Sequence, residues 1–299
     1  MDKRIAFIGY GEAAYHISSG LSRQGFSNMV AYDIDVVDPA RGPIIKAHAL
    51  EANINLVSTI SEAVDQAGFI ISLTSSKVAI EVAESVLPFL KPGQVFMDFN
   101  SASPVTKQRI SELPRPEGVK FCDVAVMSAV PLQGSKVPLL LSGEGGEEFY
   151  DQMKPYGMNI EVLSAPAGGA SAVKMVRSIF MKGYPQVLME CLLAAEAYGV
   201  TEKIIDSIEA SIGGMDTRQL ANRFFTPTIL HSARRASEMK EVVSMLEDMG
   251  HDSTMSEASR MSHENLSKLS LESEIGADDV VDYRELIPMI LNKHRSRDH

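Results

Sequence analysis

The sequence has 299 residues but only two cysteines, no tryptophan and no long hydrophobic run. Cys122 and Cys191 cannot form a disulfide framework and lack the spacing of metal ligands, so we expect a reducing compartment and no metal site. No stretch of about 20 apolar residues is present, and the first residues lack the apolar core and cleavage site of a signal peptide. We therefore expect no membrane span, no export and a cytoplasmic location.

The chain also lacks an excess of positive charge. Its formal net charge of −11 would repel the phosphates of nucleic acids, and no basic stripe interleaved with aromatic residues compensates for it. Nucleic acid is therefore not an expected partner. Hydrophobic residues make up 45% of the chain, which is enough for a sizeable core and two domains.

Short β-like runs alternate with helical stretches as far as about residue 163. The runs are IAFI, MVAYD, FIISLT, VFMDF and VKFCDVAV. Such alternation predicts a parallel sheet with crossover helices. From residue 166 onward the pattern is helical, with predicted helices over 167–198, 201–212, 229–249 and 254–269. We predict an α/β fold: a Rossmann doubly wound parallel sheet in residues 1–164, followed by an all-α domain in residues 165–299.

The first run is followed at once by glycines and then by a helical pattern, in the stretch RIAFIGYGEAAYHI. Gly9-x-Gly11-x-x-Ala14 matches the dinucleotide fingerprint in its required setting between a strand and a helix. Gly9 permits the tight turn, Gly11 lets the backbone approach a pyrophosphate, and Ala14 lets the helix pack on the strand. Glu12 and Ala13, at the helix N-terminus, are expected at the cofactor as well. The alternative is an ordinary glycine turn, but the following strand favours the cofactor.

The second run ends at Asp33, where a carboxylate can accept hydrogen bonds from the adenosine ribose of NAD. The 2′-phosphate of NADP would meet this carboxylate and that of Asp35, for which an ordinary loop carboxylate without a cofactor role is the alternative. NADP is therefore disfavoured, although Arg41 in the following loop offers a cation for it. We also place Thr74, at the end of the third run, beside the cofactor.

The order of the motifs resembles the β-hydroxyacid dehydrogenase superfamily, which includes 3-hydroxyisobutyrate and 6-phosphogluconate dehydrogenases. The segment DFNSASP over 98–104 is similar to the family's D-x-S-T-x-S-P, and FCDVAVMSA over 121–129 to its F-x-D-A-P-V-S-G-G substrate loop. The segment GGASAVKMVRS over 168–178 is similar to G-x-G-x-x-x-K-x-x-N-N. The resemblance implies hydride transfer between NAD and a small β-hydroxy acid or its oxo form, in a homodimer or homotetramer.

The same resemblance assigns roles to individual residues. Lys174 falls on the family's catalytic lysine, and Asn100 and Ser101 fall on the loop that touches nicotinamide and substrate. Met127 stands where the substrate loop usually has serine, so Ser128, one residue on, is the candidate substrate contact. Met181 stands at the position of the glutamate acid/base of the phosphogluconate enzymes, which argues against 6-phosphogluconate as the substrate.

The chemistry requires an acid/base, because hydride transfer at a hydroxyl-bearing carbon also moves a proton. Lys174 must be neutral to accept that proton, which requires a pKa lowered by desolvation or by a nearby cation. Arg177 is a candidate for that cation, or for a bidentate contact with a substrate carboxylate, and Ser178 for a hydrogen bond to the substrate. The alternative is that these are solvated groups on a helix. The small residues that flank the lysine favour close packing instead.

The segment HSARRASEM over 231–239 is similar to a subfamily with an uncharacterised helical C-terminal domain. His231, Arg234, Arg235 and Glu238 have the spacing of one helix face, which we predict to close over the substrate through His231 and Arg234. The alternative is an ion pair within the helix, expected for Arg235 with Glu238. The 16 methionines are expected to pack the helical domain against itself or a second subunit.

Two other functions stay open. Imine reduction is one, because related folds reduce C=N bonds and Met127 weakens the link to hydroxy acids. The other is a regulator that binds NAD(H) without catalysis, which would keep the glycine loop and have no need of the lysine.

Overall fold

The computed structural model describes residues 2–276 and 281–297. The chain divides into two compact units, Met1–Ile179 and Phe180–His299, and the division lies inside helix α8 (Gly169–Ala197). It therefore lies further along the chain than the predicted boundary after residue 164. The reason is that the start of α8 packs on the sheet, where Ala170 is fully buried against Ala125 and Leu140.

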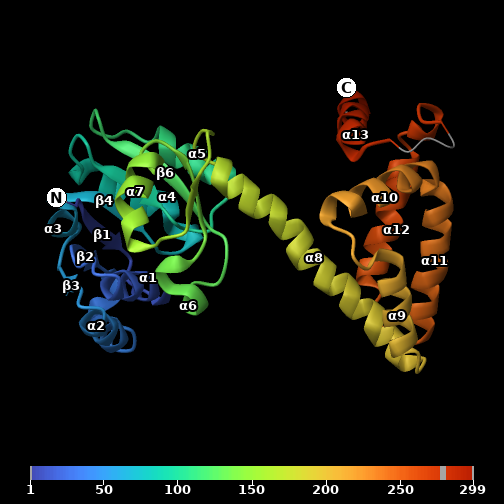
Figure 1. Cartoon of the computed structure of the whole chain (residues 1–299), viewed down its shortest axis with the longest axis horizontal. Helices are drawn as coiled ribbons and strands as arrows, with labels where there is room; N and C mark the ends of the chain where they lie inside the picture. Colours follow the sequence, from blue (N-terminus) through green and yellow to red (C-terminus); the bar gives the residue numbers. More distant parts are fainter. Residues whose placement is uncertain (1, 277–280, 298–299) are drawn as a thin grey trace. The chain divides into compact units, whose positions relative to one another are not determined.

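The first unit contains one eight-stranded sheet, in the order β3-β2-β1-β4-β5-β6-β7-β8. The strands are β1 (Arg4–Ile8), β2 (Met29–Tyr32), β3 (Asn55–Leu56), β4 (Ala67–Ser72), β5 (Val95–Asp98), β6 (Lys120–Val126), β7 (Leu139–Gly143) and β8 (Ile160–Val162). The chain first builds outward from β1 through β2 to β3, and then continues from β4 on the other side of β1 (Figure 1). This reversal between β1 and β4 is the place where doubly wound sheets bind their ligands, outside the carboxyl ends of the strands.

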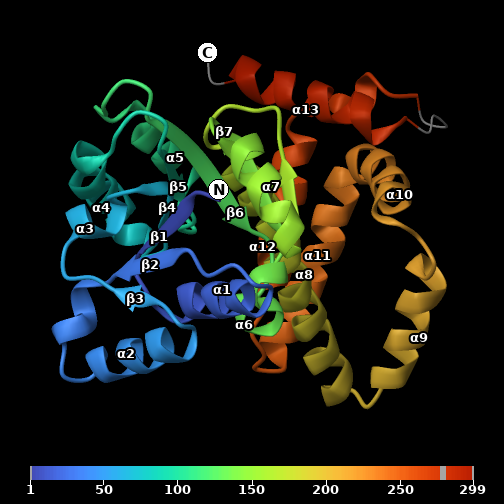
Figure 2. The same cartoon turned by 60° about the vertical axis from the view of Figure 1, so that its left-hand side comes forward.

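Helices cover both faces of the sheet, because successive side chains of a strand point to opposite faces. Ile5 and Phe7 of β1 pack with α1 (Glu12–Arg23) and α2 (Gly42–Glu51), whereas Ala6 and Ile8 pack with the helices of the other face. Those helices are α3 (Ile60–Val64), α4 (Ala79–Val86) and α5 (Pro104–Glu112). Figure 2 shows α1 and α2 on one side of the strands and α4 and α5 on the other. The predicted Rossmann fold is confirmed.

One strand departs from the predicted all-parallel sheet. β7 pairs with β6 in the antiparallel direction, whereas the other neighbouring strands pair in parallel. The connection from β6 to β7 contains only the short helices α6 (Val130–Gln133) and η4 (Gly134–Lys136). Neither helix is long enough to carry the chain back along the length of β6, so the chain returns alongside that strand.

The described residues of the second unit form helices and turns, as predicted. They comprise the rest of α8, then α9 (Thr201–Ile212), α10 (Thr217–Leu230), α11 (Ser232–Asp248), α12 (Thr254–Ser267), η6 (Leu271–Ser273) and α13 (Tyr283–Arg297). A small core joins Ile229 of α10 to Leu269, Leu271 and Leu286. Glu190 of α8 accepts hydrogen bonds from the backbone N–H groups of Met255 and Ser256, at 2.8 and 2.9 Å, and so caps the start of α12.

The predicted single helix over 229–249 is wrong, because it breaks at His231. His231 has φ −115° and ψ 20°, which ends α10 and begins α11. Ile229 of α10 packs into the core with α13, whereas α11 runs along α12 (Figure 1). One straight helix could not make both contacts. Of the helices within 2–276 and 281–297, none has both the length and the apolar character needed to cross a bilayer.

Candidate functional site

The loop between β1 and α1 has the two glycines at positions with different geometries. Gly9 has φ +87°, and a Cβ placed there would lie 2.5 Å from the Leu73 carbonyl oxygen, so only glycine fits. Gly11 has an ordinary φ of −81°, and a Cβ there would meet no protein atom within 4 Å. Ala14 is buried against the sheet, while Ala13 is half-buried and Glu12 exposed in the first turn. The loop therefore leaves open space in front of the α1 N-terminus.

Asp33 follows β2 with its carboxylate held by backbone donors. Its Oδ2 accepts a hydrogen bond from the Tyr10 N–H at 2.6 Å, and its Oδ1 accepts one from the Asp35 N–H at 2.8 Å. Tyr10 is itself buried, and burial raises its pKa to about 12, so that the phenol stays neutral and hydrogen-bonds Ser18 Oγ at 2.7 Å. The position of this carboxylate is thus fixed by the glycine loop.

A cavity of about 850 Å³ lies over these two loops. Gly9, Gly11, Glu12, Asp33 and Thr74 all line it. Three exposed apolar side chains also line it, namely Ile34, Ile44 and Val78, which are 75%, 56% and 36% exposed. At its edge Arg41 is ion-paired with Asp35 at 2.7 Å. The cavity therefore offers an apolar wall, a fixed carboxylate and a helix N-terminus, which are the parts that an adenine, a ribose and a pyrophosphate require.

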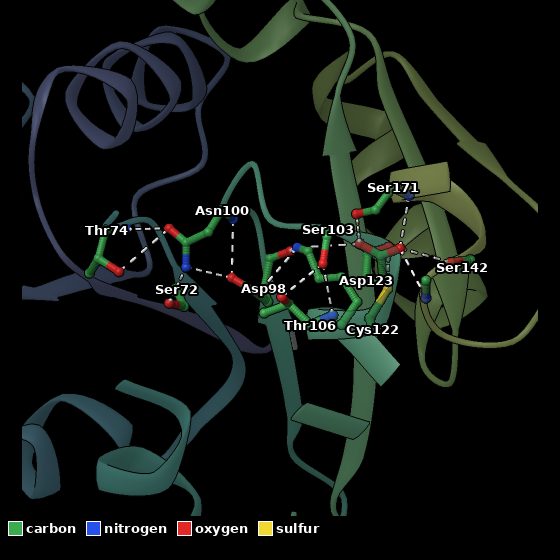
Figure 3. A network of polar contacts seen from close by, with 12 residues as sticks. Ser72, Thr74, Asp98, Asn100, Ser103, Thr106, Cys122, Asp123, Ser142 and Ser171 are labelled. Atoms are coloured by element: carbon green, nitrogen blue, oxygen red, sulfur yellow. Dashed lines mark hydrogen bonds and ion pairs between the residues drawn. The ribbon is translucent and has the colours of Figure 1, made fainter. Parts of the chain in front are cut away.

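Thr74 and Asn100 are joined at the carboxyl ends of β4 and β5 (Figure 3). Asn100 Oδ1 accepts a hydrogen bond from the Thr74 N–H at 2.7 Å, and Asn100 Nδ2 donates to Asp98 Oδ1 at 2.5 Å and to Ser72 Oγ at 3.1 Å. Its side chain is buried and satisfied by these contacts. Asn100 thus holds the shape of the loop beside the cavity, and Ser101, which follows it, is exposed.

The buried aspartates Asp98 and Asp123 continue this chain of polar contacts (Figure 3), and a buried lysine, Lys107, lies between them. Lys107 of α5 places Nζ 3.0 Å from Asp98 Oδ2 and 3.3 Å from Asp123 Oδ1. Burial raises the pKa of Asp98, while the ammonium of Lys107 acts in the opposite direction. Asp98 Oδ2 accepts no hydrogen bond of good geometry from the described residues, so this ion pair is what compensates its charge.

Asp123 of β6 holds the start of α8. Its Oδ2 accepts hydrogen bonds from the N–H groups of Gly168 and Ser171 at 3.2 and 3.0 Å, and its Oδ1 accepts one from Ser171 Oγ at 2.7 Å. Lys174 lies three residues after Ser171, on the same helix face, and is half-buried. The predicted acid/base therefore belongs to the unit that contains the cavity, on a helix anchored to its sheet.

Two of the predicted substrate contacts, Arg177 and Ser178, lie on α8, and the third, Ser128, lies in a loop. Arg177 is exposed. Ser178 donates its hydroxyl hydrogen bond to the Lys174 carbonyl oxygen at 3.0 Å, within its own helix. Ser128 is exposed in the loop after β6, where its Oγ accepts a hydrogen bond from Gln133 Nε2 at 3.1 Å.

His231 and Arg234 belong to the second unit, where the expected helix face is altered by the break at His231. Glu238 is 3.6 Å from Arg234 in an exposed ion pair. Arg235 instead donates to Thr228 Oγ1 at 2.9 Å, so the expected pair of Arg235 with Glu238 is wrong. The break lets Arg235 reach back to the end of α10. Contact of His231 and Arg234 with a substrate remains a prediction.

Cys122 does not add a reactive group to the site. Cys122 is buried beside Asp123, and burial raises the pKa of its thiol far above the usual range. Across residues 2–276 and 281–297, no three His, Cys, Asp or Glu side chains are grouped so that they could hold a metal ion.

The sequence prediction missed Lys107, Ser171 and Tyr10 as parts of this site. A signal for the buried cluster was present, because the apolar runs VFMDF and FCDVAV each contain an aspartate that a buried strand must compensate. The lysine that pairs with these aspartates was harder to predict. Lys107 lies three residues before the buried Ile110 on α5, and only that spacing marks it as facing the core.

Comparison with known proteins adds to this geometry. The NAD-binding domain of 6-phosphogluconate dehydrogenase matches residues 4–181, and a domain of unknown function, DUF1932, matches residues 195–266. A conserved hypothetical protein from Sinorhizobium meliloti 1021 is 33% identical, with 98% of this chain and 97% of that chain covered and a TM-score of 0.63.

Two further solved structures are similar. One is a conserved protein of unknown function, described as structurally similar to 3-hydroxyacid dehydrogenases, with 30% identity over 90% of this chain and 98% of that chain and a TM-score of 0.60. The other is an imine reductase from Myxococcus stipitatus, variant V8, in complex with NAD⁺. It has 16% identity over 90% of this chain and 94% of that chain and a TM-score of 0.70, which shows a shared fold.

Proposed function

Because the chain belongs to the family defined by the NAD-binding domain of 6-phosphogluconate dehydrogenase, we propose that it is an NAD-dependent oxidoreductase with Lys174 as general acid/base. Its substrate on this proposal is a small β-hydroxy acid or the corresponding oxo acid. The observation that carries the proposal is the anchoring of α8: Asp123 fixes the turn before Lys174 to the same sheet whose carboxyl edge forms the dinucleotide cavity.

The residues around the cavity fit NAD. The Gly9 turn and the open space at Gly11 accept a pyrophosphate at the N-terminus of α1, where unpaired N–H groups favour an anion. The fixed Asp33 carboxylate suits the ribose hydroxyls, and the apolar wall suits the adenine. Since Arg41 is already paired with Asp35, a 2′-phosphate would find little free positive charge there, so NAD is preferred over NADP.

When bound, the nicotinamide ring supplies or accepts the hydride. The protein moves the accompanying proton: Lys174 accepts it from the substrate hydroxyl during oxidation and returns it to the carbonyl oxygen during reduction. Ser101, Ser128 and the exposed guanidinium of Arg177 are proposed to orient the substrate and its carboxylate.

Imine reduction is the second candidate, and Met127 is the observation that favours it. Met127 takes the place of the usual serine and packs with the apolar cluster of Ala125, Leu140 and Ala170 at the start of α8. An apolar side chain there removes a hydrogen-bond donor that a hydroxy acid would use. The fold shared with an imine reductase is compatible with this alternative.

We also propose a homodimer or homotetramer, because the part of α8 in the second unit is unusually apolar and exposed. Phe180, Met181, Tyr184, Val187, Met189 and Leu193 are each 47–57% exposed. Exposed apolar patches of this kind mark interaction surfaces in soluble proteins. A second copy of the chain is the proposed occupant.

Steady-state kinetics with the full-length chain tests the proposal. β-Hydroxy acids with NAD⁺, the matching oxo acids with NADH, and cyclic imines with NADH form the substrate panel. Lys174→Met should lower turnover by at least about 100-fold while the Kd for NADH stays within about threefold, because the lysine acts on the proton. Lys182→Met, an exposed lysine on the same helix, is the matched control and should behave as the wild type.

The outcomes separate the three functions. Turnover of hydroxy or oxo acids supports the first, and turnover of imines alone supports the second. Tight NADH binding with no turnover by any compound of the panel supports a sensing protein. Near-normal activity of Lys174→Met would remove the lysine from the mechanism.

A further inference from the structure

Two aspartates face each other inside the sheet. Asp98 of β5 and Asp123 of β6 are direct register partners on neighbouring strands, and both are fully buried. Neighbouring strands lie about 4.8 Å apart. Two carboxylates on facing residues of neighbouring strands repel strongly, because the protein interior screens charge poorly. A buried pair of this kind requires a counter-charge.

Lys107 supplies that counter-charge from α5. The whole residue is buried, and its Nζ contacts Asp98 Oδ2 at 3.0 Å and Asp123 Oδ1 at 3.3 Å. The same Nζ donates a hydrogen bond to the Asp98 carbonyl oxygen at 2.5 Å. A lysine is almost never fully buried unless it is paired, and breaking such a pair leaves an uncompensated charge. Lys107 therefore joins two strands through their aspartates.

Each aspartate holds a different part of the candidate site (Figure 3). Asp98 accepts the hydrogen bond of Asn100 Nδ2, and Asn100 in turn accepts that of the Thr74 N–H at the dinucleotide cavity. Asp123 accepts the hydrogen bonds of Gly168 and Ser171 at the start of α8. Polar contacts thus run without interruption from the cavity wall to the helix of the proposed acid/base.

We propose that Lys107 is a positioning residue: its ammonium holds Asp98 and Asp123 together and thereby fixes the first turns of α8 at the edge of the sheet that also carries the Asn100 loop. The catalytic consequence rests on the proposed function of Lys174. The positional consequence does not, because it concerns only the order of residues 168–174.

Removal of the Lys107 ammonium should lower the stability of the protein by an amount that depends on pH. The titratable groups that face Lys107 are Asp98, Asp123 and the neighbouring thiol of Cys122, which burial keeps neutral. Burial raises the pKa of Asp98, and Lys107→Met would raise it further by removing the opposing cation. A carboxyl whose folded pKa lies above its unfolded value stabilises the protein below about pH 4, and this stabilisation is lost as the pH rises through the folded pKa.

A double-mutant cycle on the full-length protein tests the proposal. Lys107→Met leaves two facing carboxylates, Asp98→Asn leaves one lysine with one carboxylate, and the double variant leaves Asp123 alone. Amide hydrogen exchange over residues 168–174 reports the order of the α8 start, with α1 as the internal reference. Thermal unfolding between pH 5 and pH 8 reports the charge balance, and titration reports NADH binding.

We expect residues 168–174 of Lys107→Met to exchange at least tenfold faster than in the wild type at pH 7.5, with α1 unchanged and the Kd for NADH within about threefold. The Tm deficit of this variant should grow by about 5 to 10 °C from pH 5 to pH 8. Asp98→Asn should exchange as the wild type does. The double variant should recover most of the lost Tm and show no such growth with pH.

Unchanged hydrogen exchange over residues 168–174 in a folded Lys107→Met protein would overturn the proposal. A Tm deficit that does not depend on pH would also overturn it, because the loss of stability would then come from lost packing and not from charge. If Lys107→Met does not fold, recovery of a cooperatively unfolding protein in the double variant supports charge compensation, and failure to recover contradicts it. For any substrate that is turned over, kcat of Lys107→Met should fall about 10- to 100-fold with KM for NADH unchanged. Inactivity of the wild type towards every substrate would instead count against the proposed function and leave the exchange result standing.

Discussion

The two glycines of the β1–α1 loop are expected to respond to alanine in opposite ways. At Gly11, alanine adopts the existing φ of −81° without strain, and its Cβ meets no protein atom within 4 Å. The loss of a glycine N-cap costs a few tenths of a kcal/mol, and the reduced freedom of the unfolded chain offsets it by about the same amount. The free energy of unfolding of Gly11→Ala should therefore stay within about 0.5 kcal/mol of the wild type.

Binding should nevertheless suffer, because the new methyl group occupies the space that the pyrophosphate needs. A displacement of the phosphates from the N–H groups of α1 should cost at least about 1.4 kcal/mol, which is a tenfold weaker Kd for NADH. Gly9→Ala is the counterpart. Its φ of +87° costs about 1 to 2 kcal/mol, and its Cβ would lie 2.5 Å from the Leu73 carbonyl oxygen, so this variant should lose stability as well as binding.

Fluorescence titration with NADH and urea unfolding separate the two effects. A Gly11→Ala protein that binds NADH as tightly as the wild type would refute the placement of the pyrophosphate at this loop. If the free energy of unfolding of Gly11→Ala were as low as that of Gly9→Ala, the space next to Gly11 could not be open.

Three further predictions concern other parts of the molecule. Glu148 hydrogen-bonds Lys3, which lowers the pKa of its carboxyl, so Glu148→Gln should lower the free energy of unfolding by about 0.5 to 1 kcal/mol at pH 7. That deficit should vanish as the pH falls below about 4 and passes through the lowered pKa of Glu148 in the folded protein, because the carboxyl is then neutral. An equal deficit at pH 3 in urea unfolding would contradict this prediction. The wild type should bind NADH at least tenfold more tightly than NADPH. Asp33→Asn should lower this ratio of Kd values in the same titration, because it removes a charge that repels a 2′-phosphate. An unchanged ratio would argue against the proposed contact of Asp33 with the ribose. Phe180→Asp with Val187→Asp should shift the protein to a smaller species in light scattering, and an unchanged mass would exclude this face of α8 as the subunit contact.

The parts of the fold that depend on local sequence could be predicted. The apolar runs, the Gly9-x-Gly11 spacing and the position of Asp33 specify a strand, a turn and a carboxylate at the end of the next strand, all within about 30 residues of one another, which is the length of one βαβ unit. The helical second domain followed from its periodicity for the same reason. Each of these features depends on interactions between residues near in sequence.

The features that were missed depend on pairing between distant residues. The direction of β7 follows from the short connection after β6, and the run PLLLSG looks the same in either direction. The prediction of one helix over 229–249 did not include the break at His231, which the packing of Ile229 and of α11 decides. The pairing of Asp98 with Asp123 appears only once β5 and β6 are in register, and with it the need for Lys107.

The rate constant for hydride transfer from NADH, followed by deuterium at nicotinamide C4 in a single turnover under saturating cofactor, tests the proposed role of Lys174 most directly, because the hydride step slows when its accompanying proton has no general acid. With a substrate that the wild type reduces, we expect deuterium in the product, and a rate constant for transfer at least about 100-fold lower in Lys174→Met, with the NADH Kd preserved. A Lys174→Met protein that transfers the label at the wild-type rate across neutral pH would contradict this role.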